Sequence, residues 1–447
     1  MKRKLLLFAT ILLLSTIYAF AQTGNTGPLT WKLNQNTGIL TISGEGDMPD
    51  YIWAPWFDYR DSIKTVIIEN GVTRIGGGAF YFHKNLKTVI IPNSVKSIRG
   101  NAFFVCETLS SLIIPNSVIE IGKSAFMFSG LTSINIPNSV INIGKTAFSS
   151  CLNLVSINVD NDNPNYSSLE GVLFNKNKTT LICCPGGKTG KYVIPNGVVT
   201  IFESAFLECN KITEIEIPNS VSSIMSRAFE NCFSLASITL PSGINSIERR
   251  TFSSCYSLSS INIPNTVKSI GGSAFSKCLS LNSIVIPSSV TSIGSEAFSA
   301  CESLTSITNL NPNPVKIDFI TFVYVNISEI VLKVPSSSVS LYKNTDVWKD
   351  FIIEGIEVGI NEPIQDVSNL KIYPNPTTGK ICISFDDIES DLNLWDITFF
   401  DMNGRKLCKN NDFVLEITNH ITIDISHFPN GIYFLQIKNN IVKILKQ

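Results

Sequence analysis

The sequence predicts a β-rich (α+β) solenoid of stacked short units, followed by a small all-β sandwich. An Ala-Phe pair, replaced twice by Thr-Phe, returns about every 23 residues. Before each pair lie a segment of alternating apolar residues, such as Ile134-Asn-Ile136, and usually a proline turn. One unit of this length cannot bury its apolar side alone, so the copies must stack and share a core. The repeat phenylalanines are Phe80, Phe103, Phe126, Phe148, Phe206, Phe229, Phe252, Phe275, Phe298 and Phe322.

The composition limits the possible partners. The chain has 447 residues, with Lys+Arg 35 against Asp+Glu 36 and a formal net charge of −1. Charged residues make up 16% of the chain, compared with roughly 25% in typical domains. A balanced charge of this kind offers no basic surplus that would attract nucleic acid.

Residues 1–21 have the pattern of a signal peptide. Lys2, Arg3 and Lys4 precede an apolar run, and Ala19-Phe20-Ala21 is a small-x-small cleavage site. The apolar run is shorter than the ~20 residues that cross a bilayer, although an uncleaved anchor is the alternative. We expect a mature chain from Gln22 that is exported and has no transmembrane segment after signal cleavage.

Residues 22–60 are expected to cap the first end of the stack, since an uncapped end leaves core residues in water. Segments 29–33 and 39–42 have the pattern of two strands. Several aromatic residues follow, among them Trp53 and Trp56. An aromatic platform for a sugar is the alternative for these two tryptophans, and packing within the cap is favoured.

The solenoid is expected over residues 61–330, and one unit shows its logic. Leu109 to Ile114 alternates as a strand with one buried face. Pro115 ends the pairing because it has no N–H to donate, and Val118 to Gly122 forms a second extended segment. The Ala125-Phe126 pair that follows predicts a short helical turn whose ring fills the core.

The spacing L-x-x-L-x-L, with Ile-Pro-Asn-Ser-Val, Ile-Gly and Ala-Phe-x-x-Cys in successive units, resembles the BspA-type leucine-rich repeat of bacterial surface proteins. The resemblance covers about residues 61–330. It implies a right-handed leucine-rich-repeat solenoid with a parallel sheet on its concave face. It also implies a cell-surface location and a function in adhesion.

The interval 149–205 is longer than the others and predicts a larger coil within the rod, not a separate domain. Gly171 to Phe174 and Thr180 to Cys183 flank a polar segment, a pattern that predicts a hairpin. The preceding turn holds Asp160, Asp162 and Asn163, and calcium binds such oxygens. Their spacing matches no calcium-loop frame, so an ordinary turn is favoured and no metal is predicted.

Residues 331–358 are expected to form the second cap, 359–370 a linker, and 371–447 the small sandwich. The last segment is similar to the type A C-terminal sorting domain of the type IX secretion system. The similarity rests on Tyr373, Pro374, Asn375, Pro376, Gly379, Gly404, Gly431, Lys443 and Lys446. It implies recognition by the type IX machinery, passage across an outer membrane, and removal of the tail as the cargo is released or attached to the surface.

The chain has 11 cysteines, most of which stand three residues after a repeat phenylalanine. This place, the cysteine slot, holds His83, Ser129 and Val325 in other units, so it does not require a bond. We expect buried free thiols that act as small apolar residues, with disulfides between coils and a metal site as alternatives. The state of Cys183-Cys184 is left open, and Cys382 and Cys408 can bridge within the tail. The cysteines in the slot are Cys106, Cys151, Cys209, Cys232, Cys255, Cys278 and Cys301.

Catalysis finds little support in the sequence. His83 is the one histidine of the solenoid, and packing is its favoured role. No phosphate loop or zinc-protease motif is present. Glu214 and Glu216 point outward like the paired carboxylates of a glycoside hydrolase, but an open surface would not raise the pKa of either one. We therefore predict no enzyme activity and no cofactor.

The outward positions of successive strands form the candidate binding surface. They are mostly hydroxyl and amide side chains, which can hydrogen-bond an extended protein or a glycan. The hypothesis is noncovalent adhesion to an extracellular protein or glycan, with a passive spacer, or a less favoured glycan-processing enzyme, as alternatives. The candidates are Ser111, Ser133, Asn135, Ser156, Asn158, Glu214, Glu216, Ser237, Thr239, Ser260, Asn262 and Ser283.

Overall fold

The computed structural model describes residues 21–356 and, beyond them, 370–373, 380–385, 397–401, 407, 413–416, 420–426, 428–437 and 440–446. The chain divides into two compact units, Met1–Val358 and Gly359–Gln447. Several predictions fall on residues outside the described ones: the signal peptide up to Phe20, the linker 359–369, Pro374, Asn375, Pro376, Gly379, Gly404 and Cys408.

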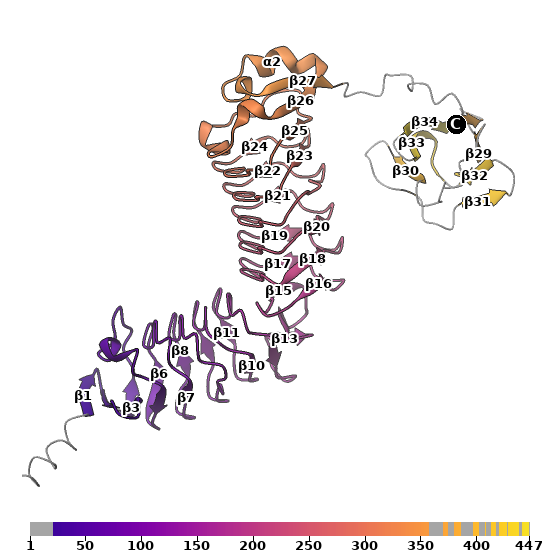
Figure 1. The fold of residues 1–447 in the computed structure, drawn as a ribbon. Helices are drawn as coiled ribbons and strands as arrows, with labels where there is room; N and C mark the ends of the chain where they lie inside the picture. The colour runs from indigo at the N-terminus through magenta and orange to yellow at the C-terminus, as the bar shows by residue number, and fades with distance from the viewer. Residues whose placement is uncertain are drawn as a thin grey trace, which may run out of the picture. The chain divides into compact units, whose positions relative to one another are not determined.

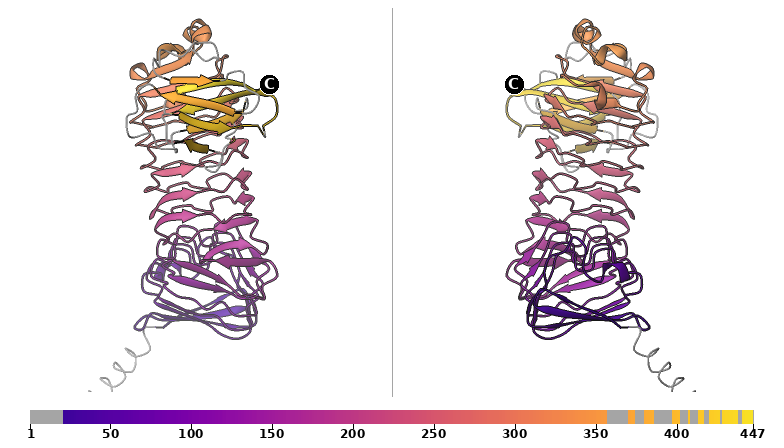
Figure 2. Two further views of the ribbon diagram at one scale, coloured as in Figure 1. Left: turned by 90° about the vertical axis from the view of Figure 1, so that its right-hand side faces the viewer. Right: turned by 90° about the vertical axis from the view of Figure 1, so that its left-hand side faces the viewer.

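The larger unit is a β-solenoid, as predicted, with strands of successive coils side by side (Figure 1, Figure 2). Pairing in the first strand row is parallel and in register, as between Ser133 and Ser156. Central residues such as Ile134 are buried, whereas Ser133 and Asn135 face outward. The strands of this row are β5 (Thr65–Ile68), β7 (Thr88–Ile90), β10 (Ser133–Ile136), β12 (Ser156–Val159), β16 (Gly190–Val193), β18 (Ile212–Glu216), β20 (Ser237–Thr239), β23 (Ser283–Ile286) and β25 (Ser306–Asn309).

Two units depart from the predicted strand. Residues 109–114 and 258–263 keep the burial alternation, with Leu112 buried and Ser111 exposed, but they do not form strands. The hydrogen bond from the Thr132 N–H to the Ser110 carbonyl (3.0 Å) joins neighbouring coils at the segment's edge. Buried side chains therefore hold the segment extended without a full strand ladder.

The second row consists of very short strands, as expected from the Val-x-x-Ile-Gly segments. Its isoleucines are mostly buried, and the pairing is again parallel, as between Ser246 and Ser269. The strands are β4 (Gly46–Asp47), β6 (Val72–Ile75), β8 (Ser97–Ile98), β9 (Glu120–Ile121), β11 (Asn142–Ile143), β17 (Thr200–Ile201), β19 (Ser223–Ile224), β21 (Ser246–Ile247), β22 (Ser269–Ile270) and β24 (Ser292–Ile293).

The third side of each coil, the turn side, carries the Ala-Phe pair and is not the predicted helical turn. Ser124 and Phe128 have φ values of 53° and 59°, and such left-handed residues interrupt a right-handed helix. The Phe126 N–H donates to the Ala147 carbonyl of the next coil (2.9 Å), and the Ser124 N–H donates to Lys145 (3.0 Å). Every second N–H of the segment therefore joins neighbouring coils, while those of Ala125 and Met127 stay within the turn and donate to the Gly122 and Ser124 carbonyls (both 3.2 Å).

The repeat phenylalanines stack in a line through the core, which we call the phenylalanine file. Consecutive ring centroids lie 5.1 to 5.6 Å apart along Phe80 to Phe148 and again along Phe206 to Phe322. Such aromatic contacts add about 0.5–1.5 kcal/mol each beyond the burial of area. The file is interrupted once, between Phe148 and Phe206.

The cysteine slot is buried and its thiols are free, as expected. The thiols also act as donors. The Cys106, Cys151, Cys232, Cys255, Cys278 and Cys301 sulfurs lie 3.1 to 3.3 Å from the carbonyl of the phenylalanine one unit earlier. Burial raises the pKa of Cys151 to about 11 and that of Cys301 to about 12, so these thiols keep the proton that they donate.

Both ends of the stack are covered by aromatic residues. At the first end, β1 (Ala21–Thr26), β2 (Leu29–Asn34) and β3 (Ile39–Gly44) form an antiparallel sheet whose last strand pairs with β5. The 3-10 turn η1 (Phe57–Tyr59) follows Trp56. Trp56 is fully buried, stacks on Phe80 at 5.9 Å, and donates its Nε1–H to the Ala79 carbonyl (2.8 Å).

At the other end, Trp348 and Phe351 lie 6.0 and 5.2 Å from the last ring of the file, Phe322. The Trp348 indole N–H donates to the Val315 carbonyl (2.7 Å), so the polar group of this buried ring has a hydrogen-bond partner. The elements here are η2 (Phe319–Phe322), η3 (Ile327–Glu329), β26 (Val331–Pro335), η4 (Ser336–Ser338), α2 (Val339–Lys343), η5 (Trp348–Asp350) and β27 (Ile352–Ile356).

The long interval forms three strands, β13 (Tyr166–Leu169), β14 (Val172–Asn175) and β15 (Thr180–Cys183), with antiparallel pairing from each to the next. The predicted hairpin is confirmed as β14–β15, whereas β13 was not predicted. β15 then pairs in parallel with β17, which returns the chain to the second row. We call residues 160–190 the corner coil, 21–159 the N-terminal arm and 191–356 the C-terminal arm.

The stacking direction changes at the corner coil (Figure 1). On the turn side the two arms touch directly, because Lys145 Nζ lies 2.6 Å from Glu203 Oε2 and Lys211 Nζ donates to the Leu152 carbonyl (3.1 Å). The added strands join the sheet of the second row. Because the two arms meet on the turn side, the turn side is the inside of the corner. The first row lies away from it (Figure 1), so at the corner the first row is not on the concave face that the resemblance implied. The buried core also divides into two clusters at this coil.

The smaller unit is all-β, as predicted. One antiparallel sheet has the order β28 (Leu370–Tyr373), β29 (Lys380–Phe385), β32 (His420–Asp424), β31 (Phe413–Glu416), and the other β30 (Ile397–Asp401), β33 (Gly431–Ile437), β34 (Asn440–Lys446). Of the sorting residues, Tyr373 ends β28, Gly431 begins β33, and Lys443 and Lys446 lie in β34. No helix in the described part of the chain is long and apolar enough to span a membrane.

Candidate binding surfaces

The predicted binding residues lie on one side of the solenoid, which we call the strand face. All of them are exposed except Ser156 and Glu214, which are half-buried. The Asn158 side chain donates to the Asn135 side chain (3.1 Å), so part of the amide row is engaged internally. The strand face consists of Ser111, Ser133, Asn135, Ser156, Asn158, Glu214, Glu216, Ser237, Thr239, Ser260, Asn262 and Ser283.

The paired carboxylates of this face share one lysine, which offsets half of their charge. Glu214 and Glu216 point outward as predicted, and Lys191 on the neighbouring strand binds both, lying 3.0 Å from Glu214 Oε1 and in direct contact with Glu216. Hydrogen bonds from the Lys191 ammonium to Glu216 and then Glu214 raise the pKa of the lysine. A glycoside hydrolase needs one carboxyl kept neutral by a dry site, and this cluster lies on open surface.

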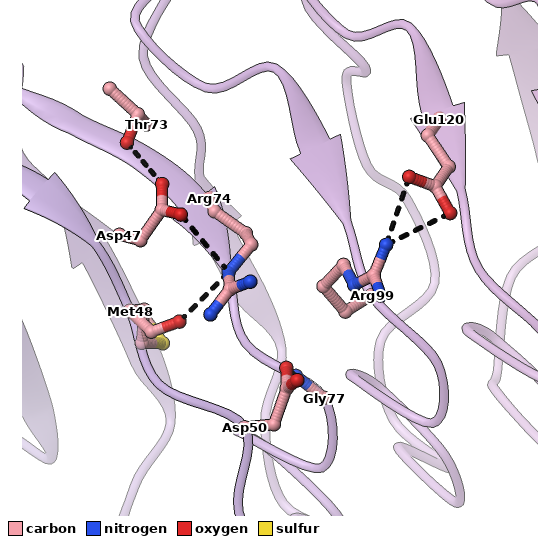
Figure 3. Close-up of polar contacts among 8 residues, drawn as sticks. All are labelled: Asp47, Met48, Asp50, Thr73, Arg74, Gly77, Arg99 and Glu120. Carbon is pink, nitrogen blue, oxygen red and sulfur yellow. Dashed lines mark hydrogen bonds and ion pairs between the residues drawn. The ribbon is translucent and has the colours of Figure 1, made fainter.

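The second strand row of the N-terminal arm carries a different set of charges (Figure 3). Arg74 lies between Asp47 (3.6 Å) and the Met48 carbonyl (3.2 Å), while Arg99 donates to both carboxylate oxygens of Glu120. Asp50 accepts from the Gly77 N–H (2.6 Å). These contacts join adjacent coils and tie the first cap to the stack, which accounts for the charges without a ligand.

An apolar groove of about 440 Å³ lies on the turn side of the N-terminal arm. Phe82, Phe104 and Phe128 line it together with Leu152, whose side chain is 41% exposed. The Phe104 and Phe128 rings meet edge to face at 5.7 Å. Lys84 and Glu107 pair beside it (2.8 Å), which leaves this rim without net charge. We call this site the aromatic groove.

The aromatic surface continues onto the first cap. Tyr81 stacks on Phe104 at 5.1 Å, and Trp53 lies 6.3 Å from Tyr81 and 4.4 Å from Phe57. Trp53 is 61% exposed, so it packs on the cap only from outside, unlike Trp56, and packing alone accounts for only part of its surface. Its ring lies over Phe57 and does not enter the core, unlike the ring of Trp56.

Sequence reasoning missed the aromatic groove. The available signal was a second aromatic residue one or two places after the repeat phenylalanine, as at Tyr81-Phe82, Phe104 and Phe128. The file phenylalanines have the same spacing, so the sequence period does not distinguish the groove residues from them. Only burial separates the two, since the file rings are buried and the groove rings are half-exposed.

The acidic turn of the corner coil is occupied by its own hydrogen bonds. Asn163 is buried and donates to the Pro137 and Val140 carbonyls (both 2.9 Å), and its Oδ1 accepts from Tyr166 N–H. The Asp160 carboxylate accepts from the Asp162 N–H (2.9 Å). These contacts favour the ordinary turn over a calcium loop. Among the described residues no cluster of His, Cys, Asp and Glu is arranged to hold a metal.

His83 occupies the cysteine slot and is buried, as predicted. Its Nδ1 lies 3.1 Å from the Tyr81 carbonyl, and its Nε2 has no hydrogen-bond partner. Desolvation lowers the pKa of His83 to about 4. The side chain therefore stays neutral and acts as a packing group.

The fold and these surfaces define a repeat solenoid with an exposed polar strand face and an apolar groove. Comparison with known families agrees. The model of the BspA type leucine rich repeat region matches residues 51–180, 186–305 and 269–346, and that of the secretion system C-terminal sorting domain matches 371–447. The chain belongs to the BspA-type leucine-rich repeat family. The sorting domain assigns it to the type IX route, which ends at the cell surface or outside the cell.

Solved structures share the fold. A leucine-rich repeat protein from Eubacterium ventriosum is 24% identical, with 77% of this chain and 98% of that chain covered and a TM-score of 0.54. The pneumococcal vaccine antigen PcpA is 20% identical, with coverage of 75% and 99% and a TM-score of 0.58. No curated protein matches the chain.

Proposed function

We propose that this chain is a non-catalytic surface protein that binds a protein partner noncovalently. The observation that carries the proposal is the aromatic groove, an apolar hollow on a protein that the sorting tail directs to the surface. Exposed apolar patches rimmed by polar groups are typical of interaction sites. Aromatic residues are also enriched among those that dominate binding energy.

The ring geometry favours a protein over a glycan in the groove. Sugars stack on open ring faces, whereas Tyr81 and Phe104 cover each other's faces with planes 13° apart. A bulky apolar side chain of a partner fits the remaining hollow between Phe104, Phe128 and Leu152. The strand face would supply hydrogen bonds to a partner that extends around the coil.

Binding of the full-length mature chain to arrays of extracellular matrix proteins, bacterial surface proteins and glycans tests the proposal. We expect saturable binding to a protein. The affinity should fall at least tenfold in Phe104→Ser and in Phe128→Ser. Phe233→Ser is the matched control, because Phe233 is a half-buried ring stacked on Tyr256 at 4.7 Å in the other arm. Binding to glycans alone would contradict the protein assignment, and silence on every array would favour the passive spacer.

The glycan-processing alternative has its own test. Glu214→Gln should leave any trace hydrolysis of polysaccharides unchanged, because Lys191 holds both carboxylates on open surface. A hydrolysis rate that falls at least a hundredfold in this variant, and not in Glu248→Gln, would restore the enzyme hypothesis.

A further inference from the structure

The corner coil has Cys184 at the place where the remaining repeat coils have a file phenylalanine. The Cys184 N–H donates to the Ala205 carbonyl of the next coil (2.7 Å), just as the Phe206 N–H donates to Ala228 (2.8 Å). Cys184 is buried, like the ring that it replaces. The phenylalanine file is interrupted at this coil for that reason.

This replacement brings two thiols together. The Cys209 sulfur lies 3.6 Å from the Cys184 carbonyl. The sulfurs of Cys184 and Cys209 are both 3.9 Å from the same Pro185 carbonyl oxygen. The Cys184 side chain is also the main cause that raises the pKa of the Cys209 thiol.

Other neighbouring cysteines of the slot are held apart. Cys232, Cys255 and Cys278 each donate to a separate phenylalanine carbonyl, at 3.1 to 3.2 Å. Each thiol is thus directed toward the backbone of the preceding coil and not toward the next sulfur. The pair at the corner differs because its partner stands in the ring position, pointing into the core beside Cys209.

We propose that Cys184 and Cys209 are joined by a disulfide in the exported protein. Export passes the chain through an oxidising compartment, where disulfides form and persist. The two thiols lose two protons and two electrons as the sulfur–sulfur bond forms. A disulfide-bearing oxidoreductase of that compartment accepts them and leaves as a dithiol. The bond closes a loop across the 25 residues that separate the two cysteines.

The disulfide must form before the coils close. Thiolate is the attacking species in thiol–disulfide exchange, and the interaction with the Cys184 side chain, together with burial, raises the pKa of Cys209 well above its usual value. The folded, reduced protein should therefore resist oxidation. The bond would tie the corner coil to the first coil of the C-terminal arm, beside the place where the phenylalanine file is interrupted.

Peptide mapping of the full chain, purified after export and alkylated under denaturing conditions without reductant, tests the proposal. We expect a cross-linked pair of peptides containing Cys184 and Cys209, with a mass lower by two hydrogen atoms than the sum of the reduced peptides. Reductant before alkylation should abolish it. Recovery of both cysteines in alkylated form without reductant, or a link from Cys209 to another cysteine, would overturn the assignment.

Two variants identify the sulfur involved, since Cys183 and Cys184 lie in one peptide. Cys183→Ala should retain the cross-link, whereas Cys184→Ala should leave Cys209 fully alkylated. Cys232→Ala is the matched control for loss of a buried slot thiol and should retain the cross-link. A cross-link that disappears in Cys183→Ala and survives in Cys184→Ala would refute the pairing.

Discussion

The two arms of the solenoid share one internal framework and differ in what they display. Both have file phenylalanines at 5.1 to 5.6 Å and the same hydrogen bonds between turns. On the turn side, however, the N-terminal arm displays aromatic rings such as Phe104 and Phe128, where most coils of the C-terminal arm have polar residues such as Ser253 and Lys277. The last coil of the C-terminal arm is the exception, with the exposed Tyr324. Since the framework tolerates either set, the aromatic set is not needed for folding, and this difference points to binding.

The largest expected effect concerns the two cores. Phe126→Ala and Phe252→Ala each remove a fully buried ring, which typically costs about 3–5 kcal/mol of unfolding free energy. Because the core divides at the corner coil, amide exchange should rise mainly in the arm that carries the substitution. Equal loss of protection in both arms, measured by mass spectrometry, would show that the arms unfold as one unit.

The pH effect of His83 should be confined to the N-terminal arm. His83 has a folded pKa of about 4, lowered by desolvation from 6.5. The contribution of neutral His83 to the free energy of unfolding is therefore fully present above pH 6.5. It is lost as the pH falls toward 4, because the unfolded chain takes up the proton first. We expect the N-terminal arm to lose roughly 2 kcal/mol between pH 7 and 5. His83→Ser should flatten this pH dependence, and an unchanged slope would contradict the assignment.

The donor role of the slot thiols can be separated from their packing. Cys255 lies 3.2 Å from the Phe229 carbonyl. Cys255→Ala removes the hydrogen bond and the sulfur, at a cost of about 1–2 kcal/mol. Cys255→Ser should cost less in chemical denaturation because a hydroxyl keeps a donor at this place. Equal costs for both variants would indicate a purely apolar role.

The smallest expected effect concerns the strained turns. Lys277 is exposed with φ of 59° and occupies the same place as Phe128 in the other arm. A glycine at this place would relieve about 1 kcal/mol of left-handed strain. Part of that gain in stability is offset because glycine raises the conformational entropy of the unfolded chain. Lys277→Gly should therefore be more stable than the matched Lys277→Ala, which keeps the strain. The reverse order would mean that the turn imposes little cost in either arm.

The repeat spacing was sufficient to predict the coil, its buried residues and the stack. The turn side was mispredicted because Ala-Phe within a polar segment resembles a helix start, and the left-handed angles of Ser124 and Phe128 depend on bonds to the next coil. The hairpin was predictable from its own residues. The corner was not, because it follows from contacts such as Lys145–Glu203, between residues far apart in the sequence.

The same distinction holds for the surfaces. Alternation along each strand predicted which side chains face outward, including Glu214 and Glu216. The lysine that pairs with both carboxylates, Lys191, lies on the preceding strand within the long interval 149–205, so its register was hidden. The aromatic groove combines side chains from several coils, and a search within a single unit cannot find it.

The interrupted phenylalanine file has a consequence for how such proteins change over generations. With no ring crossing the corner, gain or loss of whole coils in one arm leaves the packing of the other untouched. The length of the solenoid can then change by duplication of coils in one arm. The side chains of the contacting surface can change separately, by point substitution in the other arm.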